Sequence, residues 1–185
     1  MNLNLARGFY ENSLRCPGNL ALSVGVQELT YSELRMLVQP VANWLRRNSE
    51  EPAPRIGILA SRSLATYTGI LGTCWAGGTY VPISTKLPED RLIQLLDLVR
   101  AEALIVDSEG VGTLSKRVLS HAPRLILAPE LAVSSTMQSD KGTSVTVAGM
   151  DSLPRFDPFD VPVPINADHV VYIIFTSGTT GIPKG

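Results

Sequence analysis

The sequence predicts an α/β fold in which a mostly parallel sheet is flanked by helices. Short apolar runs of strand length alternate with amphipathic stretches of helix length between residues 55 and 129. The apolar runs are almost continuously hydrophobic, which is typical of strands buried on both faces. The alternation is the pattern of β-α-β units, and we expect right-handed crossovers between the strands.

The N-terminal residues predict a helix and a hairpin. Residues 2–15 form an amphipathic helical pattern that ends at Cys16-Pro17-Gly18. The stretches NLALSV and QEL predict two short strands on either side of Gly25.

A second, longer helix is expected after Thr30. Thr30 and Glu33 have the spacing of a capping box, in which each residue satisfies a backbone N–H through its side chain. Pro40 lies inside the helical pattern. Because proline removes a hydrogen bond from a helix interior, we expect it to kink or split this helix.

Four strands and three helices follow in alternation. The strands are expected over residues 55–60, 79–84, 103–107 and 124–129, and the helices over 61–78, 88–102 and 115–123. Ser61 is the predicted N-cap of the first of these helices, which ends at Gly77-Gly78. Pro88 opens the second helix.

Residues 130–167 interrupt this alternation. The polar stretch at about 130–145 lacks periodicity and predicts a mobile surface loop. The proline-rich stretch 157–168 predicts extended chain. The last predicted element is a buried strand over 169–175, which leads into a glycine- and threonine-rich end.

Composition excludes several classes of protein. The 185 residues suffice for one ordinary domain, and 44% hydrophobic with 18% charged residues indicates a globular chain. A net charge of −1 argues against a nucleic-acid partner. There is no signal-peptide pattern and no run of about 20 apolar residues, so we expect a cytoplasmic protein without a membrane partner.

The cysteines and histidines indicate no metal site. Cys16 and Cys74 are far apart and form no CxxC pair, so neither a zinc site nor a disulfide is expected. Cys74 lies in an apolar stretch, which predicts a buried thiol. His121 and His169 lack the neighbouring partners that a ligand or a catalytic base needs.

The C-terminal loop has the chemistry of a phosphate site. It follows the last predicted strand, and open α/β sheets bind ligands beyond the carboxyl ends of their strands. Its glycines let backbone N–H groups approach an anion, its hydroxyls donate to phosphate oxygens, and Lys184 adds a positive charge. The loop residues are Thr176, Ser177, Gly178, Thr179, Thr180 and Gly181. Together they suit a triphosphate.

Other glycine-rich motifs fit less well. The common P-loop would require glycine at Pro183 and a hydroxyl residue at Gly185. A flavodoxin-like or NAD-binding domain requires a glycine-rich turn after the first strand of the alternation, and residues 55–63 contain none. Composition alone fits a flexible linker equally well.

The order of the residues, TSGTTGIPKG, resembles the phosphate-binding signature of the adenylate-forming enzymes. These are amino-acid adenylation domains, acyl- and aryl-CoA ligases, and luciferases. Residues 29–34 and 69–92 resemble two further core motifs of the family, although Ser84-Thr85 replaces the usual Asp-Pro. The stretches AGGTYVPI and PEDRL favour an adenylation domain of a nonribosomal peptide synthetase, or a free-standing relative, over a CoA ligase.

The resemblance implies an ATP-dependent ligase. Family members join a carboxylic acid to AMP and then pass the acyl group to the thiol of carrier-protein phosphopantetheine or of coenzyme A. It implies that Lys184 and the six loop residues bind the ATP phosphates, with Mg²⁺ present, and that the acid is an amino acid. The catalytic residues are expected downstream of Gly185.

The resemblance also implies that residues 1–185 are a partial N-terminal subdomain, with the phosphate-binding loop at 176–185. Its partner would be the missing C-terminal portion of the same enzyme, and the fragment alone would be inactive. A different class of function remains open, a non-catalytic folded interaction module that exposes apolar surface.

Overall fold

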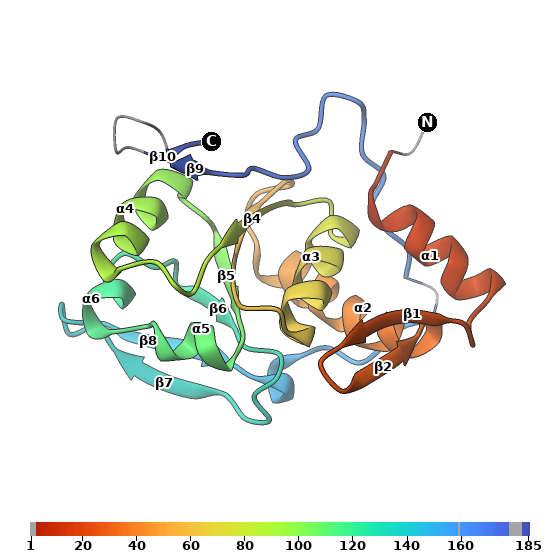
Figure 1. The fold of residues 1–185 in the computed structure, drawn as a ribbon, viewed down its shortest axis with the longest axis horizontal. Helices are drawn as coiled ribbons and strands as arrows, with labels where there is room; N and C mark the ends of the chain where they lie inside the picture. The colour runs from red at the N-terminus through yellow and green to blue at the C-terminus, as the bar shows by residue number, and fades with distance from the viewer. Residues whose placement is uncertain (1–2, 159, 178–182) are drawn as a thin grey trace.

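A six-stranded sheet lies at the centre of the computed structural model, which describes residues 3–158, 160–177 and 183–185 (Figure 1). The strand order is β4-β3-β5-β6-β8-β7. The strands are β3 (Arg55–Leu59), β4 (Thr79–Ile83), β5 (Ala103–Val106), β6 (Leu125–Leu127), β7 (Ser135–Gln138) and β8 (Ser144–Ala148). Neighbouring strands run parallel except β7 and β8, so the predicted mostly parallel sheet is confirmed.

Helices cover both faces of the sheet. One face carries α1 (Ala6–Arg15), α2 (Tyr31–Asn48) and α3 (Leu64–Trp75), and the other carries α4 (Glu89–Val99), α5 (Ser108–Gly112) and α6 (Lys116–Leu119). Successive residues of one strand face opposite clusters: Ile105 packs with α2 and α3, and Leu104 with α4. Burial on both faces explains why these strands are hydrophobic at almost every position.

The N-terminal elements agree with the sequence in detail. The strands β1 (Leu20–Val24) and β2 (Gln27–Thr30) form an antiparallel hairpin, and Gly25 in its turn has φ 59°. The Glu33 N–H donates to Thr30 Oγ1 (3.3 Å) and the Thr30 N–H donates to Glu33 Oε2 (2.8 Å), so the capping box is confirmed. The Thr30 N–H, with its hydroxyl, lowers the pKa of the Glu33 carboxyl.

The helix α2 continues through Pro40 without a break, so the expectation that proline could split it was wrong. Val38 and Val41 flank the proline, are buried, and pack into the core shared with α3. The two helices are in close contact, since a Cβ on Gly72 of α3 would lie 2.8 Å from Val41 Cγ1. Burial of this face stabilises the helix more than one missing hydrogen bond destabilises it.

A β-hairpin replaces the surface loop expected at about 130–145. The strand β7 pairs with β8 at the edge of the sheet, and Val145 and Val147 of β8 are buried. The Asp140 N–H donates to the Lys116 carbonyl (3.0 Å), which ties the turn to α6. Only one face of this hairpin is apolar. Because its other face is polar, the sequence of this stretch was interpreted as a loop. Mobility of the segment stays a prediction.

The segment before the C-terminal loop is extended but is not the buried strand expected over 169–175. It forms one isolated bridge, between Tyr172 and Tyr80 of β4. Its side chains alternate: Ile173 and Phe175 pack against the core, whereas Val170 and Ile174 are each 56% exposed. Only one side of this apolar run is therefore packed against the core, and the other side is exposed. The described residues of the preceding stretch 157–168 form no helix or strand and include turns at Pro158 and at residues 167–168, so extended chain over the whole stretch stays a prediction. Only the short helix η1 (Met150–Ser152) lies between β8 and this stretch.

None of the helices in the described ranges has the length and apolar character needed to cross a membrane.

Candidate functional site

The two ends of the predicted phosphate-binding loop lie side by side. The strand β9 (Thr176–Ser177) pairs antiparallel with β10 (Pro183–Lys184), so that Thr176 is opposite Lys184 and Ser177 opposite Pro183. The structure thus brings together the backbone of three predicted site residues. The other four, Gly178, Thr179, Thr180 and Gly181, lie outside the described residues. A glycine-rich segment is therefore closed at its base by a hairpin ladder.

The base of this hairpin rests on aromatic and aliphatic side chains. A Cβ on Gly185 would lie 2.9 Å from the Phe175 ring and 3.0 Å from Ile173 Cγ2, so any side chain at this position would displace one of them. Phe175 and Ile173 also pack against the core cluster that contains α4. The hairpin accordingly lies beside α4 in Figure 1. This packing accounts for the glycine at the last position of the motif.

The strand β4 positions the chain that leads into the hairpin. The Thr79 hydroxyl donates to the Val170 carbonyl. The Tyr80 N–H donates to the Val171 carbonyl (3.1 Å), and the Ile173 N–H donates to the Tyr80 carbonyl (3.1 Å). Burial raises the pKa of the Tyr80 phenol. The role of Thr79 was not predicted. A hydroxyl residue beginning an apolar strand was the signal that could have revealed it.

Buried polar side chains of α2 hold the extended segment before residue 168. Gln39 is fully buried, and its amide binds the backbone of Asp157 on both sides, accepting from its N–H (2.7 Å) and donating to its carbonyl. The Arg35 guanidinium lies over the rings of Tyr10 and Phe156 and donates to the Pro158 carbonyl (2.8 Å). Two polar residues on the apolar face of a helix were the sequence signal for this contact.

Further along, Asp160 fixes the same segment to α3. Its Oδ2 accepts from Trp75 Nε1 (3.0 Å), and its Oδ1 pairs with Arg46 Nη1 (2.7 Å). The Val163 N–H then donates to the Trp75 carbonyl (2.9 Å), and Asn4 Nδ2 donates to the Val163 carbonyl (2.8 Å). The chain thus reaches the hairpin along a path held by side chains from the N-terminal helices.

A carboxylate of the chain joins the segments that follow the carboxyl ends of β3 and β5. The connections from these strands leave in opposite directions, which is where open α/β sheets commonly bind nucleotides. Here Asp107 accepts from the Ser61 N–H (2.8 Å), the Ser61 hydroxyl (2.7 Å) and the Gly110 N–H (2.7 Å). Burial raises the pKa of Asp107, but these hydrogen bonds outweigh it and the net shift is downward. The Ser61 and Gly110 N–H groups therefore already donate to Asp107 and are not available to a phosphate.

The same contacts correct one capping prediction. Ser61 binds Asp107, and the N-cap of α3 is Ser63, whose Oγ accepts from the Thr66 N–H (3.4 Å).

The cysteines and histidines take structural positions. Cys74 is buried, as expected, and burial raises its pKa to about 11. Both cysteines are free thiols. His121 Nδ1 lies 2.9 Å from Asp97 Oδ1 on the surface. Across the described ranges, His, Cys, Asp and Glu side chains nowhere gather in threes around a point that could hold a metal ion.

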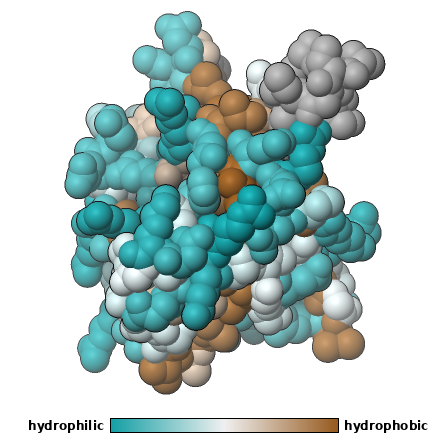
Figure 2. Space-filling model, turned by 90° about the vertical axis from the view of Figure 1, so that its left-hand side faces the viewer, coloured by the Kyte–Doolittle hydropathy of each residue, from teal (hydrophilic) through white to brown (hydrophobic). Residues whose placement is uncertain are grey.

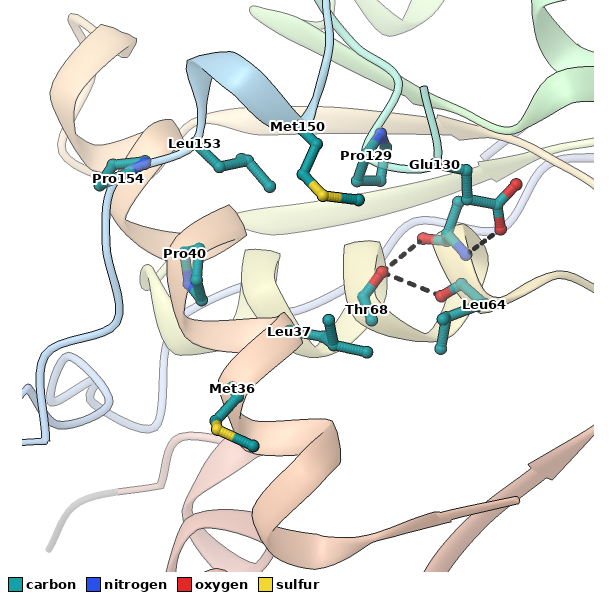
Figure 3. Close-up of a pocket in the computed structure, with 11 residues that line it drawn as sticks. Met36, Leu37, Pro40, Leu64, Thr68, Pro129, Glu130, Met150, Leu153 and Pro154 are labelled. Atoms are coloured by element: carbon teal, nitrogen blue, oxygen red, sulfur yellow. Dashed lines mark hydrogen bonds between the residues drawn. The ribbon is translucent and has the colours of Figure 1, made fainter. Parts of the chain in front are cut away.

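An apolar cavity of about 250 Å³ lies away from the hairpin (Figure 3). It is bordered by α2, the first turns of α3, and the chain after β6 and β8. None of the described residues after 154 lines it, so Thr176, Ser177 and the described end of the predicted loop, 183–185, take no part in it.

Comparison with known proteins identifies the family. The family model described as AMP-binding enzyme matches residues 9–185. Bacitracin synthase 2 of Bacillus licheniformis is 31% identical over 96% of this chain, and malpinin synthetase of Mortierella alpina is 30% identical over 100% of it. The chain spans only 6% and 2% of the length of these two relatives.

Solved structures agree on the fold. The N-terminal subdomain of NpsA from Klebsiella oxytoca is 23% identical with a TM-score of 0.67, and the alignment covers 99% of this chain and 41% of that one. ATP-bound MatB from Rhodopseudomonas palustris is 23% identical with a TM-score of 0.71, covering 100% of this chain and 34% of that one. The family match, the fold and the hairpin agree, and the chain belongs to the AMP-binding enzyme family.

Proposed function

We propose that this chain supplies the ATP phosphate-binding part of an enzyme that activates an amino acid as its acyl-adenylate. The observation that carries the proposal is the sequence TSGTTGIPKG placed on a paired hairpin, with Thr176 opposite Lys184. The pairing joins the ends of a segment rich in backbone and hydroxyl donors. Such a segment can surround a phosphate chain on several sides.

The proposed reaction requires the pyrophosphate leaving group to be bound and positioned by the protein. A carboxylate oxygen of the acid attacks the α-phosphorus of ATP, the new C–O–P linkage forms, and the bond to the bridging oxygen of the β-phosphate breaks. Pyrophosphate leaves with that electron pair. Catalysis of such a displacement depends on positioning and on neutralising charge. Thr176, Ser177, Thr179 and Thr180 would donate hydroxyl hydrogen bonds to the β- and γ-phosphates, and Gly178 and Gly181 would donate backbone N–H groups.

Lys184 would neutralise charge on the leaving pyrophosphate. Its backbone lies in β10, opposite Thr176, so its attachment point is fixed at the mouth of the loop. Mg²⁺, when bound with ATP, would add further charge neutralisation through the phosphate oxygens, which suits an ion that prefers oxygen ligands and retains waters. The loop itself contains donors and no carboxylate, which fits a site that receives the metal already bound to the nucleotide.

The acceptor in the second half-reaction is proposed to be the phosphopantetheine thiol of a carrier protein. The similarity to bacitracin synthase 2 and malpinin synthetase supports the synthetase branch, which AGGTYVPI with PEDRL also favours. Coenzyme A is the alternative acceptor, as in the CoA ligases of the family. The catalytic residues are proposed to lie on a further part of the enzyme, so that residues 1–185 bind nucleotide and do not catalyse adenylation alone.

Calorimetric titration of the chain with Mg·ATP tests this proposal. We expect saturable binding that Lys184→Ala weakens by roughly tenfold, the equivalent of about 1.4 kcal/mol for one charged hydrogen bond. Lys184→Arg is the matched control, because it retains the charge, and we expect it to bind with less than half of that loss. Amino-acid-dependent exchange of pyrophosphate into ATP should be absent.

Two outcomes would contradict it. Exchange activity in residues 1–185 would show that no further catalytic part is needed. Self-association that depends on concentration, without binding of Mg·ATP, would instead favour the non-catalytic interaction module.

A further inference from the structure

The cavity of Figure 3 lies at the ligand-binding edge of the sheet. Pro129 and Glu130 follow the carboxyl end of β6, Met150 follows that of β8, and the first turns of α3 follow β3. In an open parallel sheet this edge is where small molecules bind, because the loops that leave the strands enclose space there. The cavity is formed by residues 36–154, and no described residue of the proposed phosphate-binding loop contributes to it.

Its walls expose large apolar side chains. Met36, Leu37 and Met150 are 50%, 37% and 53% exposed, and they border one hollow of about 250 Å³. In Figure 3, Met36 and Leu37 extend from α2, and Met150 lies on the opposite wall. A ligand that covered them would remove apolar surface from water, and the two flexible methionines could adapt to its shape. Figure 2 shows hydrophobic residues gathered in the upper part of its view and at its lower edge, with hydrophilic residues between them.

Two polar side chains line this cavity, those of Glu130 and Thr68. Glu130 is the one ionisable residue in the lining; its Oε1 accepts from the Ala65 N–H (2.9 Å), and the described residues place no donor on its Oε2. The Thr68 hydroxyl donates its proton to the Leu64 carbonyl (2.9 Å), with the Ala65 carbonyl also in range (3.3 Å), so its oxygen can act only as an acceptor for a ligand. Pro40 also lines the cavity and has no N–H to give to the Met36 carbonyl one turn earlier.

A cavity with apolar walls, acceptors and one negative charge favours a particular ligand chemistry. The ligand must carry hydrogen-bond donors and a positive charge, and the rest of it must be apolar. Glu130 would repel a ligand carboxylate. The cavity is therefore chemically unlike a site that binds the carboxylic acid to be activated. A bare inorganic cation would leave the exposed Met36, Leu37 and Met150 uncovered.

We propose that this cavity binds a small apolar primary ammonium ion, with its –NH₃⁺ group on Glu130 and its hydrocarbon body against Met36, Leu37 and Met150. The available volume suits a single ring with a short alkyl arm. The helix α3 keeps its contact with Glu130, because the Ala65 N–H occupies one oxygen and the ligand takes the other.

Titration with 2-phenylethylammonium, followed through ¹³C-methyl signals of the methionines, tests this assignment. We expect saturable shifts at Met36 and Met150, with Met137 of β7 as the unshifted internal control. 2-Phenylethanol has nearly the same shape without the charge, and 3-phenylpropionate carries the opposite charge. Because Glu130 is exposed, its ion pair with the ligand is a weak one, and we expect the alcohol to bind about threefold to fivefold more weakly than the ammonium ion and the carboxylate more weakly still.

Glu130→Gln is the decisive variant, because glutamine keeps the side-chain length and an oxygen for the Ala65 N–H. This variant should bind the ammonium ion about threefold to fivefold more weakly and bind the alcohol as before. A thermal midpoint close to that of the unsubstituted protein would show that the variant is folded. The proposal is overturned if Met36 and Met150 show no saturable shift, if the carboxylate binds as well as the ammonium ion, or if Glu130→Gln binds both probes as before.

Discussion

Tyr80 and Tyr172 lie on either side of a parallel β-bridge, with their ring centroids 5.7 Å apart. Within the described part of the chain, this bridge and the bonds beside it are what join the segment 169–175 to the sheet. Tyr172 precedes the hairpin by only a few residues. The edge of β4 therefore determines where the proposed phosphate-binding loop begins.

The hydroxyl of Thr79 should contribute measurably to this attachment. Thr79 is buried and donates to the Val170 carbonyl, so Thr79→Val leaves that carbonyl without its donor while retaining the side-chain shape. We expect a loss of about 1–2 kcal/mol in the free energy of unfolding and faster hydrogen exchange at the Ile173 amide. Thr79→Ser keeps the hydroxyl and should exchange more slowly than the valine variant. Equal exchange in both variants would remove the role given to the hydroxyl.

Gly110 and Gly112 should respond in opposite ways to the same substitution. A Cβ on Gly110 would lie 2.0 Å from the Leu59 carbonyl oxygen, whereas nothing lies within 4 Å of one on Gly112. Gly110→Ala forces two backbone segments apart and should cost about 3 kcal/mol or more in unfolding free energy. Gly112→Ala, in the same helix α5, should be neutral or slightly stabilising. Chemical denaturation measures both, and similar midpoints would contradict the close approach of α5 to β3.

The Asp107 carboxylate should make stability depend on pH in the acid range. Burial raises its pKa, but the hydrogen bonds from Ser61 and Gly110 lower it by more, so in the folded protein Asp107 binds protons less readily than in the unfolded chain. Its contribution is therefore present at pH values above the unfolded pKa and is lost as the pH falls through the folded pKa. Asp107→Asn should be less stable at pH 7, by about 1–2 kcal/mol, and should lose less stability between pH 5 and pH 3. Parallel pH profiles for the two proteins would contradict this assignment.

The two cysteines should differ strongly in reactivity. Cys74 is 5% exposed and its pKa is raised to about 11, so at pH 8 only about one thiol in a thousand would be ionised. Cys16 is half-buried near the end of α1. A thiol reagent at pH 8 should therefore modify one cysteine quickly and the second only on unfolding. Rapid modification of both in the native protein would show that Cys74 is accessible.

The sequence predicted the elements whose pattern depends on local chemistry. The capping box of Thr30 and Glu33, the turn at Gly25 and the alternating strands and helices all agree with the structure. These features depend on residues close together in the chain. The order of the strands, with β4 and β5 on opposite sides of β3, depends on packing and was not predicted.

The errors arose where distant contacts decided the outcome. Pro40 does not break α2, because Val38 and Val41 pack into the core beside it. Ser61 is not the N-cap of α3, since Asp107, 46 residues later, binds it. Residues 169–175 are apolar enough for a buried strand. The segment is bridged to β4 on one side, and Val170 and Ile174 are exposed, so it is not a buried strand. At the candidate site, the sequence indicated the loop, while the supports from Thr79, Gln39 and Asp160 required the fold.

The central claim is that the hairpin loop at 176–185 binds the phosphates of ATP. Its most direct test is a titration of the ¹⁵N-labelled chain with Mg·ATP, with assigned amide signals. We expect saturable shifts concentrated at Gly178, Gly181 and their neighbours in the loop, which Mg·pyrophosphate reproduces and adenosine does not. Shifts confined to residues outside 170–185, or equal shifts with adenosine, would contradict it.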